Sequence, residues 1–489
     1  MAVWTPHFSD FEHVFAEQNP WQSQGAVPPS LAPPVERPLA QLLWQRLLRD
    51  EPLRYQLVLG PRRVGKTTVL YQTVRHLLRR VEPRQVWWLR MDHPLLLQMP
   101  LGTLVRSVLD ASAATTDRPT YLMLDELVYA ADWDLWLKTF YDERWPVRIA
   151  ATSSATAALR ERRVESGVGR WEEQYLMPYL FDEFLHLIEQ QHEIAVAHTL
   201  GQTLRTLPPG QPADATLGRW RRAFLFVGGF PELLVRQYRD ELDEQPDESN
   251  LLLASQQVLR SDAVERAIYK DIPQSFGVNN PMMLERVLYV LAGQIAGLLS
   301  PSNIGADLGL SQPTFDRYLS YLKRAFLVFT LSNYSGHEVS VQRRGRKLYF
   351  VDGAVRNAAL QRGLAPLDDP GEMGTLIENL TAASLHTLSV HAGLRLHHWR
   401  DGNREVDLIL EDPHQPLAFE IGTSIHHSRS GLLALMERHK HFRGHSYLVS
   451  PQAVVRHPDD TGMGTLPLDT FLLAVGAQAH QALADRLRS

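Results

Sequence analysis

The stretch LVLGPRRVGKTTVL, at residues 57–70, constrains the fold of this chain more than any other part of it. An apolar run leads into a loop that fits the pattern G-x-x-x-x-G-K-[ST] at Gly60, Gly65, Lys66 and Thr67, and a helical pattern comes next. The glycines allow backbone amides to wrap around phosphate oxygens, and the N-terminus of the helix adds a favourable dipole. The stretch therefore predicts a strand, a phosphate-binding loop and a helix.

Strand and helix patterns alternate around this loop. Strands are expected at 55–60, 85–90, 120–127 and 147–154, and helices at about 66–80 and 101–111. Such alternation is typical of a parallel sheet that helices cover on both faces. The sequence thus predicts an α/β domain of the P-loop NTPase class.

The loop predicts ATP and Mg²⁺ as cofactors. Lys66 is expected to reach the β and γ phosphates, and Thr67 is expected to ligate the metal. The full set of predicted nucleotide contacts is Gly60, Pro61, Arg62, Arg63, Val64, Gly65, Lys66, Thr67, Thr68 and Ser154.

A second acidic strand would complete a hydrolytic site, and TYLMLDELVYAADW at 120–133 fits it. Asp125 suits the magnesium shell, and Glu126 suits the base that orients the attacking water. The next predicted strand ends in hydroxyls, so Ser154 or Thr152 is a candidate for sensing the γ phosphate. Strand ends also carry Ser and Thr as simple caps, and this alternative stays open.

Oligomeric ATPases often complete their site with an arginine from a neighbouring subunit, which stabilises transition-state charge. The candidates between the fourth strand and LMPYLFDEFL (176–185) are Arg160, Arg162, Arg163 and Arg170. Arg170 is the predicted catalytic arginine, supplied in trans within a homo-oligomer. The alternative for each of the four is a solvated basic helix.

Composition limits the other possibilities. A chain of 489 residues exceeds one ordinary core, so about three domains are expected. The absence of cysteine excludes disulfides, thiolate zinc sites and a cysteine nucleophile. Neither a secretory signal nor a membrane-spanning apolar run is found, which predicts a cytoplasmic protein without membrane contact. A net charge of −5 means that any DNA binding needs local basic patches.

The stretches GPRRVGKTT, LMLDEL, ATSSA, LMPYLFDEF and FVGGFPELL, taken in order, resemble a family of bacterial and archaeal AAA-type ATPases. The resemblance spans about residues 35–455. It implies a helical lid marked by the Gly-Gly-Phe-Pro segment at 228–231, a winged-helix region, and a C-terminal domain of restriction-endonuclease-like fold.

Breaks in composition and this resemblance together predict five segments. They are an N-terminal segment with a proline-rich linker (1–38), an AAA-type core (39–205), a helical lid (206–280), a winged helix-turn-helix (281–352) and a restriction-endonuclease-like domain (353–489). The proline-rich part, 25–38, is expected to tether the N-terminal stretch to the rest of the chain.

Residues 298–331 have the pattern of a helix-turn-helix, and two strands at 327–334 and 347–352 would form a wing. A basic cluster, QRRGRKLYF, precedes the second strand. The predicted DNA contacts are Gln312, Thr314, Arg317, Lys323, Arg343, Arg344, Arg346 and Lys347. A solvated hairpin is the alternative for the basic cluster, and a protein-protein module is the alternative for the winged helix.

In the C-terminal segment a helix with an acid is followed by strands that carry Asp407 and Glu420. This is the order of a PD-(D/E)xK nuclease core, and the resemblance implies that Glu378, Asp407 and Glu420 match its metal-binding acids. Glu405 is expected to point away from Asp407. Gly422 stands where such sites place a lysine, and the nearest downstream lysine, Lys440, has no support from spacing. The missing cation favours DNA binding over cleavage.

The leading hypothesis is an ATP-hydrolysing motor or remodelling switch that acts on DNA, branched or fork DNA included, and uses a degenerate nuclease-like domain for binding. One alternative is an ATP-gated, Mg²⁺-dependent DNA nuclease. Another is a signalling ATPase whose C-terminal domain binds a protein partner.

Overall fold

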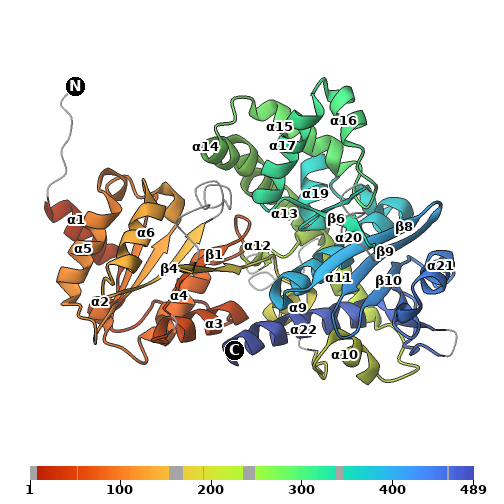
Figure 1. Cartoon of the computed structure of the whole chain (residues 1–489), viewed down its shortest axis with the longest axis horizontal. Coiled ribbons are helices and arrows are strands. Elements are labelled where there is room, and N and C mark those ends of the chain that lie inside the picture. Colours follow the sequence, from red (N-terminus) through yellow and green to blue (C-terminus); the bar gives the residue numbers. More distant parts are fainter. Residues whose placement is uncertain are drawn as a thin grey trace. The chain divides into compact units, whose positions relative to one another are not determined.

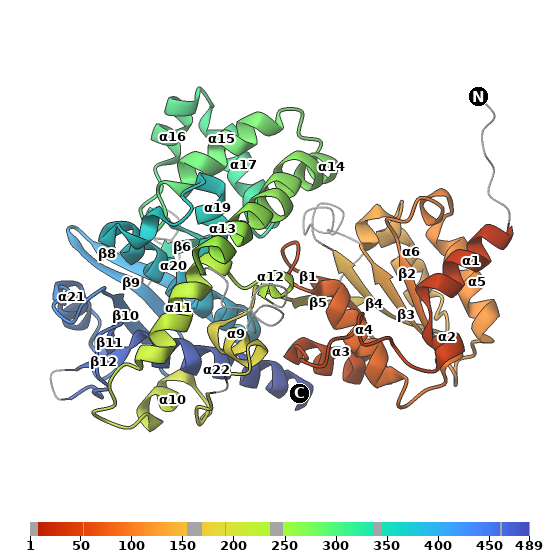
Figure 2. The same cartoon turned by 180° about the vertical axis from the view of Figure 1, so that it is seen from behind.

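The computed structural model describes residues 8–51, 53–153, 169–190, 192–234, 248–335, 345–459 and 462–488. The chain divides into two compact units, one of residues 1–176 with 484–489 and one of residues 177–483, and Figures 1 and 2 show them from opposite sides. None of the helices in the described ranges has the length and apolar character needed to cross a bilayer.

The first unit is built on a five-stranded parallel sheet with the strand order β2-β3-β4-β1-β5. Its elements are α1 (Phe8–Gln18), α2 (Trp21–Gln24), α3 (Pro38–Leu48), β1 (Tyr55–Leu59), α4 (Lys66–Leu77), β2 (Val86–Arg90), α5 (Leu101–Ser112), β3 (Thr120–Asp125), α6 (Trp133–Asp142), β4 (Val147–Ser153) and β5 (Trp171–Tyr175). Every residue of β1 and β3 is buried, as expected for central strands of a parallel sheet. The predicted α/β fold is confirmed. Sequence analysis missed β5, whose WEEQY sequence lacks an apolar run.

The N-terminal segment packs on this sheet. The Asn19 side chain accepts a hydrogen bond from the Trp88 backbone N–H (2.5 Å) and donates one to the Trp88 carbonyl (3.0 Å). Trp21 is fully buried and donates through Nε1 to the Val86 carbonyl. Since β2 is an edge strand, these bonds occupy backbone groups that would otherwise be open to pairing.

The proline-rich segment is held against α4. Gln72 donates to the carbonyl of Val35 (2.8 Å) and accepts from the backbone N–H of Arg37 (3.3 Å). Arg75 donates to the carbonyl of Ala32 (2.7 Å) and pairs with Glu36. The segment expected to be a tether is therefore hydrogen-bonded along the helix that comes after the phosphate loop.

The second unit begins with helices and continues into a second sheet. Its helices are α9 (Phe181–Leu187), α10 (Leu200–Thr206), α11 (Ala215–Val227), α12 (Pro231–Leu234), α13 (Glu248–Leu259), α14 (Ile272–Phe276), α15 (Pro281–Ala292), α16 (Pro301–Leu308), α17 (Gln312–Arg324), α19 (Gly353–Leu360), α20 (Pro370–Ala392), α21 (Ser430–Arg438) and α22 (Leu468–Arg488), the last residues of which belong to the first unit. Two π-helical segments, Arg260–Glu265 and Ala267–Asp271, connect α13 to α14.

The second sheet has seven strands in the order β12-β11-β10-β9-β8-β6-β7. They are β6 (Val328–Asn333), β7 (Lys347–Phe350), β8 (Arg395–Asp401), β9 (Arg404–Glu411), β10 (Leu417–Ile421), β11 (Ser446–Ser450) and β12 (Met463–Pro467). The two strands predicted as a wing do pair in antiparallel fashion, as β6 and β7. β6 also pairs in parallel with β8, so this hairpin is continuous with the C-terminal sheet.

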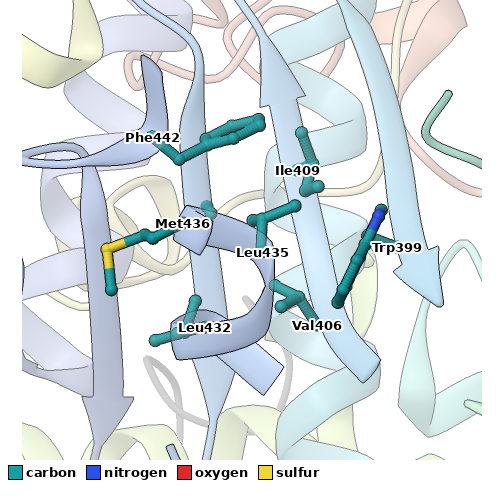
Figure 3. Close-up of a cluster of buried hydrophobic side chains, with 8 residues drawn as sticks. Trp399, Val406, Ile409, Leu432, Leu435, Met436 and Phe442 are labelled. Carbon is teal, nitrogen blue, oxygen red and sulfur yellow. The ribbon is translucent and has the colours of Figure 1, made fainter. Parts of the chain in front are cut away.

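Helix α21 packs on one face of this sheet. Figure 3 shows Leu432, Leu435 and Met436 of the helix beside Val406 and Ile409 of β9. The pairing of β8 with β9 is irregular between His397 and Trp399, which pair with Ile409 and Val406, so both of these residues face α21. Glu405 and Asp407, the direct neighbours of Val406, lie on the other side. This pleat determines where the acids of β9 lie.

Candidate functional site

The predicted phosphate loop forms as expected between β1 and α4. Gly65 has a φ of 91°, a left-handed conformation that suits glycine, and α4 starts at Lys66. A side chain at Gly60 would overlap the carbonyl oxygen of Leu176 on the chain beyond β5. Lys66 is buried, and its Nζ donates to the carbonyls of Gly60 (3.1 Å) and Pro61 (2.8 Å). The ammonium is thus held inside the loop.

The remaining predicted nucleotide contacts differ in exposure. Val64 is buried, Arg62 and Thr68 are half-buried, and Arg63 and Thr67 are exposed. Ser154 lies outside the described residues.

Asp125 joins the phosphate loop to the end of β3. Its carboxylate accepts hydrogen bonds from Thr67 Oγ1 (3.1 and 3.2 Å) and from Thr152 Oγ1 (2.6 Å). Burial raises the pKa of Asp125 to about 6, and the charge of Glu126 adds to this effect. Thr67 and Asp125, predicted from separate motifs as metal ligands, therefore lie in contact.

Thr152, a candidate for sensing the γ phosphate, is hydrogen-bonded to both Asp125 and Glu126. Its hydroxyl oxygen accepts from the backbone N–H of Glu126 (2.9 Å) while it donates to Asp125. Glu126 has a φ of 54°, a left-handed conformation that turns the chain sharply after β3. Thr152 thus orders the two neighbouring acids.

The chemistry of these residues suits the binding of Mg²⁺ and a nucleoside triphosphate. The hydroxyl of Thr67 and the buried carboxylate of Asp125 are the hard oxygen donors that Mg²⁺ prefers, and Lys66 and the α4 N-terminus carry the positive charge that phosphate needs. Thr67 and Asp125 would hold the metal, and Lys66 would hold the phosphates.

Arg170, the predicted catalytic arginine, pairs with Asp142 at the end of α6. Its Nε and Nη2 donate to the two carboxylate oxygens at 2.8 and 3.1 Å, and this pairing raises the pKa of Arg170. A role in trans would require the pair to separate, and it stays a prediction. Arg160, Arg162 and Arg163 lie outside the described residues.

The second sheet holds a buried cation that sequence analysis assigned elsewhere. Lys347, predicted as a DNA contact on the wing, has a side chain only 2% exposed. Its Nζ lies 3.0 Å from Asp407, 3.2 Å from Glu378 and 2.5 Å from Glu405. The assignment of Lys347 to a DNA-facing surface is wrong, because β7 is in the sheet and turns this side chain inward.

The prediction for Glu405 is also wrong. Residues 405 and 407 are two apart on β9, so their side chains share a face. Both carboxylates contact the ammonium of Lys347. On the same side, Tyr349 donates through its hydroxyl to Glu378 (2.8 Å), and this tyrosine is fully buried.

Protonation in this group reflects burial and shared charge. Burial and the charge of Asp407 raise the pKa of Glu378 to about 7. Burial alone would lower the pKa of Lys347, but Tyr349, Asp407 and Glu378 raise it well above its ordinary value. The lysine therefore stays charged at neutral pH.

Glu420, on β10, completes the acidic group, which with Lys347, Glu378, Glu405 and Asp407 we call the β7–β10 cluster. Its Oε1 lies 3.1 Å from His427 Nε2, and its Oε2 has no hydrogen-bond partner among the described residues. Burial raises the pKa of Glu420 to about 7, and Asp407 contributes to the rise. A side chain at Gly422 would meet His427, since its Cβ would lie 2.5 Å from the His427 Cβ.

The carboxylates do not form a closed metal cage. Across the described ranges, no three or more histidine or acidic side chains are placed to enclose a metal ion together. In the β7–β10 cluster the reason is visible, because the ammonium of Lys347 lies among three of the four carboxylates.

Two helices, α16 and α17, form where the helix-turn-helix was predicted. Ser311 caps α17 by accepting from the Thr314 N–H, and Phe315, Leu319 and Leu322 form its buried face. The predicted DNA contacts Gln312, Arg317 and Arg346 are exposed, Thr314 is half-buried, and Lys323 is exposed and donates to Thr330 (3.0 Å). Arg343 and Arg344 lie outside the described residues.

Comparisons with known proteins identify a family model over the phosphate loop and the strands beside it. Residues 54–185 match a family model described as an AAA domain, and residues 219–365 match a domain of unknown function, DUF8612. The chain is 25% identical over 397 residues to the uncharacterized protein MJ1637 of Methanocaldococcus jannaschii, covering 79% of each protein. It is 20% identical over 397 residues to an uncharacterized protein of Haemophilus influenzae, covering 79% of this chain and 87% of the relative.

Among solved structures, a Walker-type ATPase of Pyrococcus abyssi matches at 15% identity with a TM-score of 0.42, covering 65% of this chain and 94% of that one. The ORC1 protein of Aeropyrum pernix, solved in complex with DNA, matches at 12% identity with a TM-score of 0.30, covering 67% and 92%. The family match, the parallel sheet and the contact between Thr67 and Asp125 coincide in one region. Residues 54–185 thus combine a match to an AAA domain model with the geometry of a phosphate-binding loop.

Proposed function

We propose that this chain hydrolyses ATP and couples hydrolysis to a conformational change that acts on DNA. The observation that carries the proposal is the contact of Thr67 with Asp125 beside the buried ammonium of Lys66. With Glu126 directly after Asp125, these groups supply phosphate binding, metal binding and a base for water. Loss of the γ phosphate would shift the population of conformations.

The DNA part of the proposal rests on α17 and the chain around it. Gln312 and Arg317 are exposed on the helix that would enter a groove, and Arg346 is exposed just before β7. Arg343 and Arg344 extend this basic segment in sequence. Because the whole chain carries a net charge of −5, such a local patch is what could attract DNA phosphates.

We further propose that residues 281–352 act as a winged helix and that residues 353–489 form a restriction-endonuclease-like domain. β6 and β7 come after α17 as the two strands of a wing would. In the C-terminal part, α20, β8, β9 and β10 carry Glu378, Asp407 and Glu420 in the order expected for that fold.

The test is the ATPase rate of the full-length protein with no DNA and with single-stranded, duplex and branched DNA. We expect DNA to raise the rate several-fold and Lys66→Ala to abolish it. A rate that no form of DNA changes would favour the alternative of a signalling ATPase with a protein partner.

DNA binding is tested separately by its dependence on salt. The Arg317→Ala variant and a triple variant at Arg343, Arg344 and Arg346 should each bind more weakly, with a shallower salt dependence, because phosphate contacts release counterions. Arg222→Ala, at an exposed position of α11, is the matched control. Equal binding by all of these proteins would refute the assigned surface.

A further inference from the structure

Two motifs of the sequence, LMPYLFDEF at 176–184 and FVGGFPELL at 226–234, contain none of the residues assigned to the nucleotide site. In the second unit the two motifs meet. The backbone N–H of Tyr179 donates to the carbonyl of Gly229 (2.8 Å). A side chain at Gly229 would overlap the backbone nitrogen and the carbonyl oxygen of Tyr179. Glycine is therefore what allows these two stretches of backbone to approach each other.

A buried carboxylate from a third element, the turn between β7 and α19, holds this contact. Asp352 Oδ2 accepts from the backbone N–H of Gly229 (2.7 Å), and its Oδ1 accepts from the N–H of Ala354 at the start of α19 (2.8 Å). Gly228 has a φ of 74°, and its Cβ would lie 2.8 Å from Asp352 Oδ2. We call Tyr179, Gly228, Gly229, Asp352 and Ala354 the Asp352 junction.

The hydrogen bonds of this junction are strong ones. Burial raises the pKa of Asp352 to about 6, which still leaves the carboxylate mostly ionised at neutral pH. Hydrogen bonds to an ionised acceptor are about twice as strong as those between neutral groups. Gln256 of α13 adds to them, since its side-chain amide donates to the carbonyls of Phe226 and Ala354. The end of α11 and the start of α19 are thus tied together from two sides.

The chain that enters the junction leaves the phosphate loop three residues earlier. Within the first unit, the N–H of Leu176 donates to the carbonyl of Leu59 (2.8 Å), the residue before Gly60. The carbonyl oxygen of Leu176 lies where a side chain at Gly60 would be. Three residues of chain span at most about 11 Å. A movement of the phosphate loop would therefore reach Tyr179 through a short stretch of backbone.

A small cavity in the second unit leaves room for such a movement. Its volume is about 20 Å³, about enough for one water molecule. Tyr179 and Asp352 line it together with Phe224 of α11 and with Ser384 and Thr387 of α20. Because protein interiors are otherwise close-packed, a displaced backbone needs such a space. The junction is thus firmly bonded and lies next to space into which Tyr179 can shift.

We propose that the Asp352 junction couples nucleotide binding at the phosphate loop to the arrangement of α11 and α19, with Asp352 as the positioning residue. The inference rests on the proposed function, since it needs a nucleotide at that loop. Val351 alone separates Asp352 from β7, so a shift of Gly229 against Asp352 is passed to β7 and, through strand pairing, to β6 after α17. ATP turnover and contacts of α17 then depend on each other.

Amide hydrogen exchange of the full-length protein, with and without Mg²⁺ and a non-hydrolysable ATP analogue, tests the proposal without DNA or hydrolysis. We expect the nucleotide to change exchange in residues 177–180 and 226–230 at least about threefold, and Lys66→Ala to abolish the change. A response of the phosphate-loop amides without one at the junction would overturn the proposal and leave the ATPase proposal intact. If neither responds, nucleotide binding itself is refuted, and the coupling with it.

Asp352→Asn and a matched control, Asp369→Asn, separate coupling from the capping of a helix. Asp369 caps α20 by accepting from the N–H groups of Gly371 and Glu372, but it is exposed and these bonds stay within that helix. Asp352→Asn should reduce the response of the junction to nucleotide, and any stimulation of the ATPase by DNA, at least about fivefold. The ATPase rate without DNA should change less than about twofold. Asp369→Asn should alter none of these quantities.

A response to nucleotide in Asp352→Asn as large as in the wild type would overturn the role given to Asp352. Each variant is first compared with the wild type by thermal unfolding. Asn preserves the shape of Asp352 and keeps one acceptor oxygen, whereas Gly229→Ala would meet the backbone of Tyr179 and can prevent folding. The exchange experiment on the wild type decides the proposal even if Asp352→Asn fails to fold.

Discussion

Asp125 is a residue whose burial lowers the free energy of unfolding while it places a carboxylate beside Thr67. Its carboxylate is buried and accepts hydrogen bonds from Thr67 and Thr152. Burial raises its pKa to about 6 from an ordinary value of 3.8. The pKa of Asp125 is higher in the folded than in the unfolded protein, so ionisation of its carboxylate lowers the free energy of unfolding. This loss grows as the pH rises between the two pKa values and is constant at higher pH.

We therefore expect Asp125→Asn to raise the free energy of unfolding of the nucleotide-free protein by about 2–3 kcal/mol at pH 8, with little effect at pH 4. The same variant should lose Mg²⁺-dependent ATP binding. In the wild type, Mg²⁺–ATP affinity should fall about tenfold per pH unit below pH 6, as the ligand takes up a proton. Urea titrations and calorimetry would measure these effects. An Asp125→Asn variant that is less stable at pH 8 would contradict them.

Gly422 has a steric reason to be glycine. Its Cβ would lie 2.5 Å from the Cβ and 2.7 Å from the Cγ of His427, and the His427 Cβ cannot move without the loop backbone. A lysine at this position would meet the same obstacle. Sequence analysis interpreted Gly422 as the loss of a catalytic lysine. The structure shows that a glycine here leaves room for His427, which lies beside Glu420.

We expect Gly422→Ala to lower the free energy of unfolding by about 1–3 kcal/mol, because overpacking forces the backbone to shift. Adding His427→Gly should recover most of this loss, since it removes the obstructing side chain. Thermal or chemical unfolding of the two single variants and the double variant gives the coupling directly. Additive losses would show that the two residues do not interact.

At the scale of elements, the edge strand β2 depends on the segment before the proline-rich stretch. Asn19 is 2% exposed and bonds to both the N–H and the carbonyl of Trp88. The side-chain amide of Asn19 thus makes the two hydrogen bonds to Trp88 that a residue of a neighbouring strand would make. The pattern of the sequence did not indicate this, because an asparagine before a proline also suits an ordinary turn.

Asn19→Ala is expected to destabilise the first unit by about 1–3 kcal/mol, because it leaves two backbone groups of β2 without partners in a buried place. Ser23→Ala is the matched control, since the Ser23 hydroxyl is exposed and donates to the nearby Pro20 carbonyl. Urea unfolding followed by tryptophan fluorescence would report the difference. Equal stability of the two variants would contradict the role given to Asn19.

For the whole molecule, the division into two units predicts two unfolding transitions. The nucleotide site, from Gly60 to Asp125, lies within the unit of residues 1–176, and the β7–β10 cluster lies within residues 177–483. A ligand that binds only the folded state of one unit stabilises that unit alone, as far as the two unfold independently.

Differential scanning calorimetry should therefore show two transitions, of which Mg²⁺ with a non-hydrolysable ATP analogue raises only one. At a ligand concentration of about 100 Kd the gain should be about 2.7 kcal/mol. Lys66→Ala should remove this shift without moving the other transition. A single transition that moves as a whole would mean that the two units unfold together.

Much of the first unit was predictable from sequence because its signals are local. The phosphate loop occupies consecutive residues, and the central strands are apolar runs, so the α/β fold and the pairing of Thr67 with Asp125 followed from pattern alone. β5 was missed because its polar sequence carries no such run. α16 and α17 were predicted correctly because helical periodicity is local too.

By itself, then, the sequence determined the phosphate loop and its acidic neighbour Asp125, since motif and geometry coincide there. Only the tertiary structure decided the role of Lys347, which meets Glu378, Glu405 and Asp407 from elements far apart in sequence. Its place beside arginines suggested a surface, and only the pairing of β7 with β6 and the packing of β7 against α20 turn it inward. The long-range order of the strands, which no local pattern encodes, brings the ammonium of Lys347 to these three carboxylates.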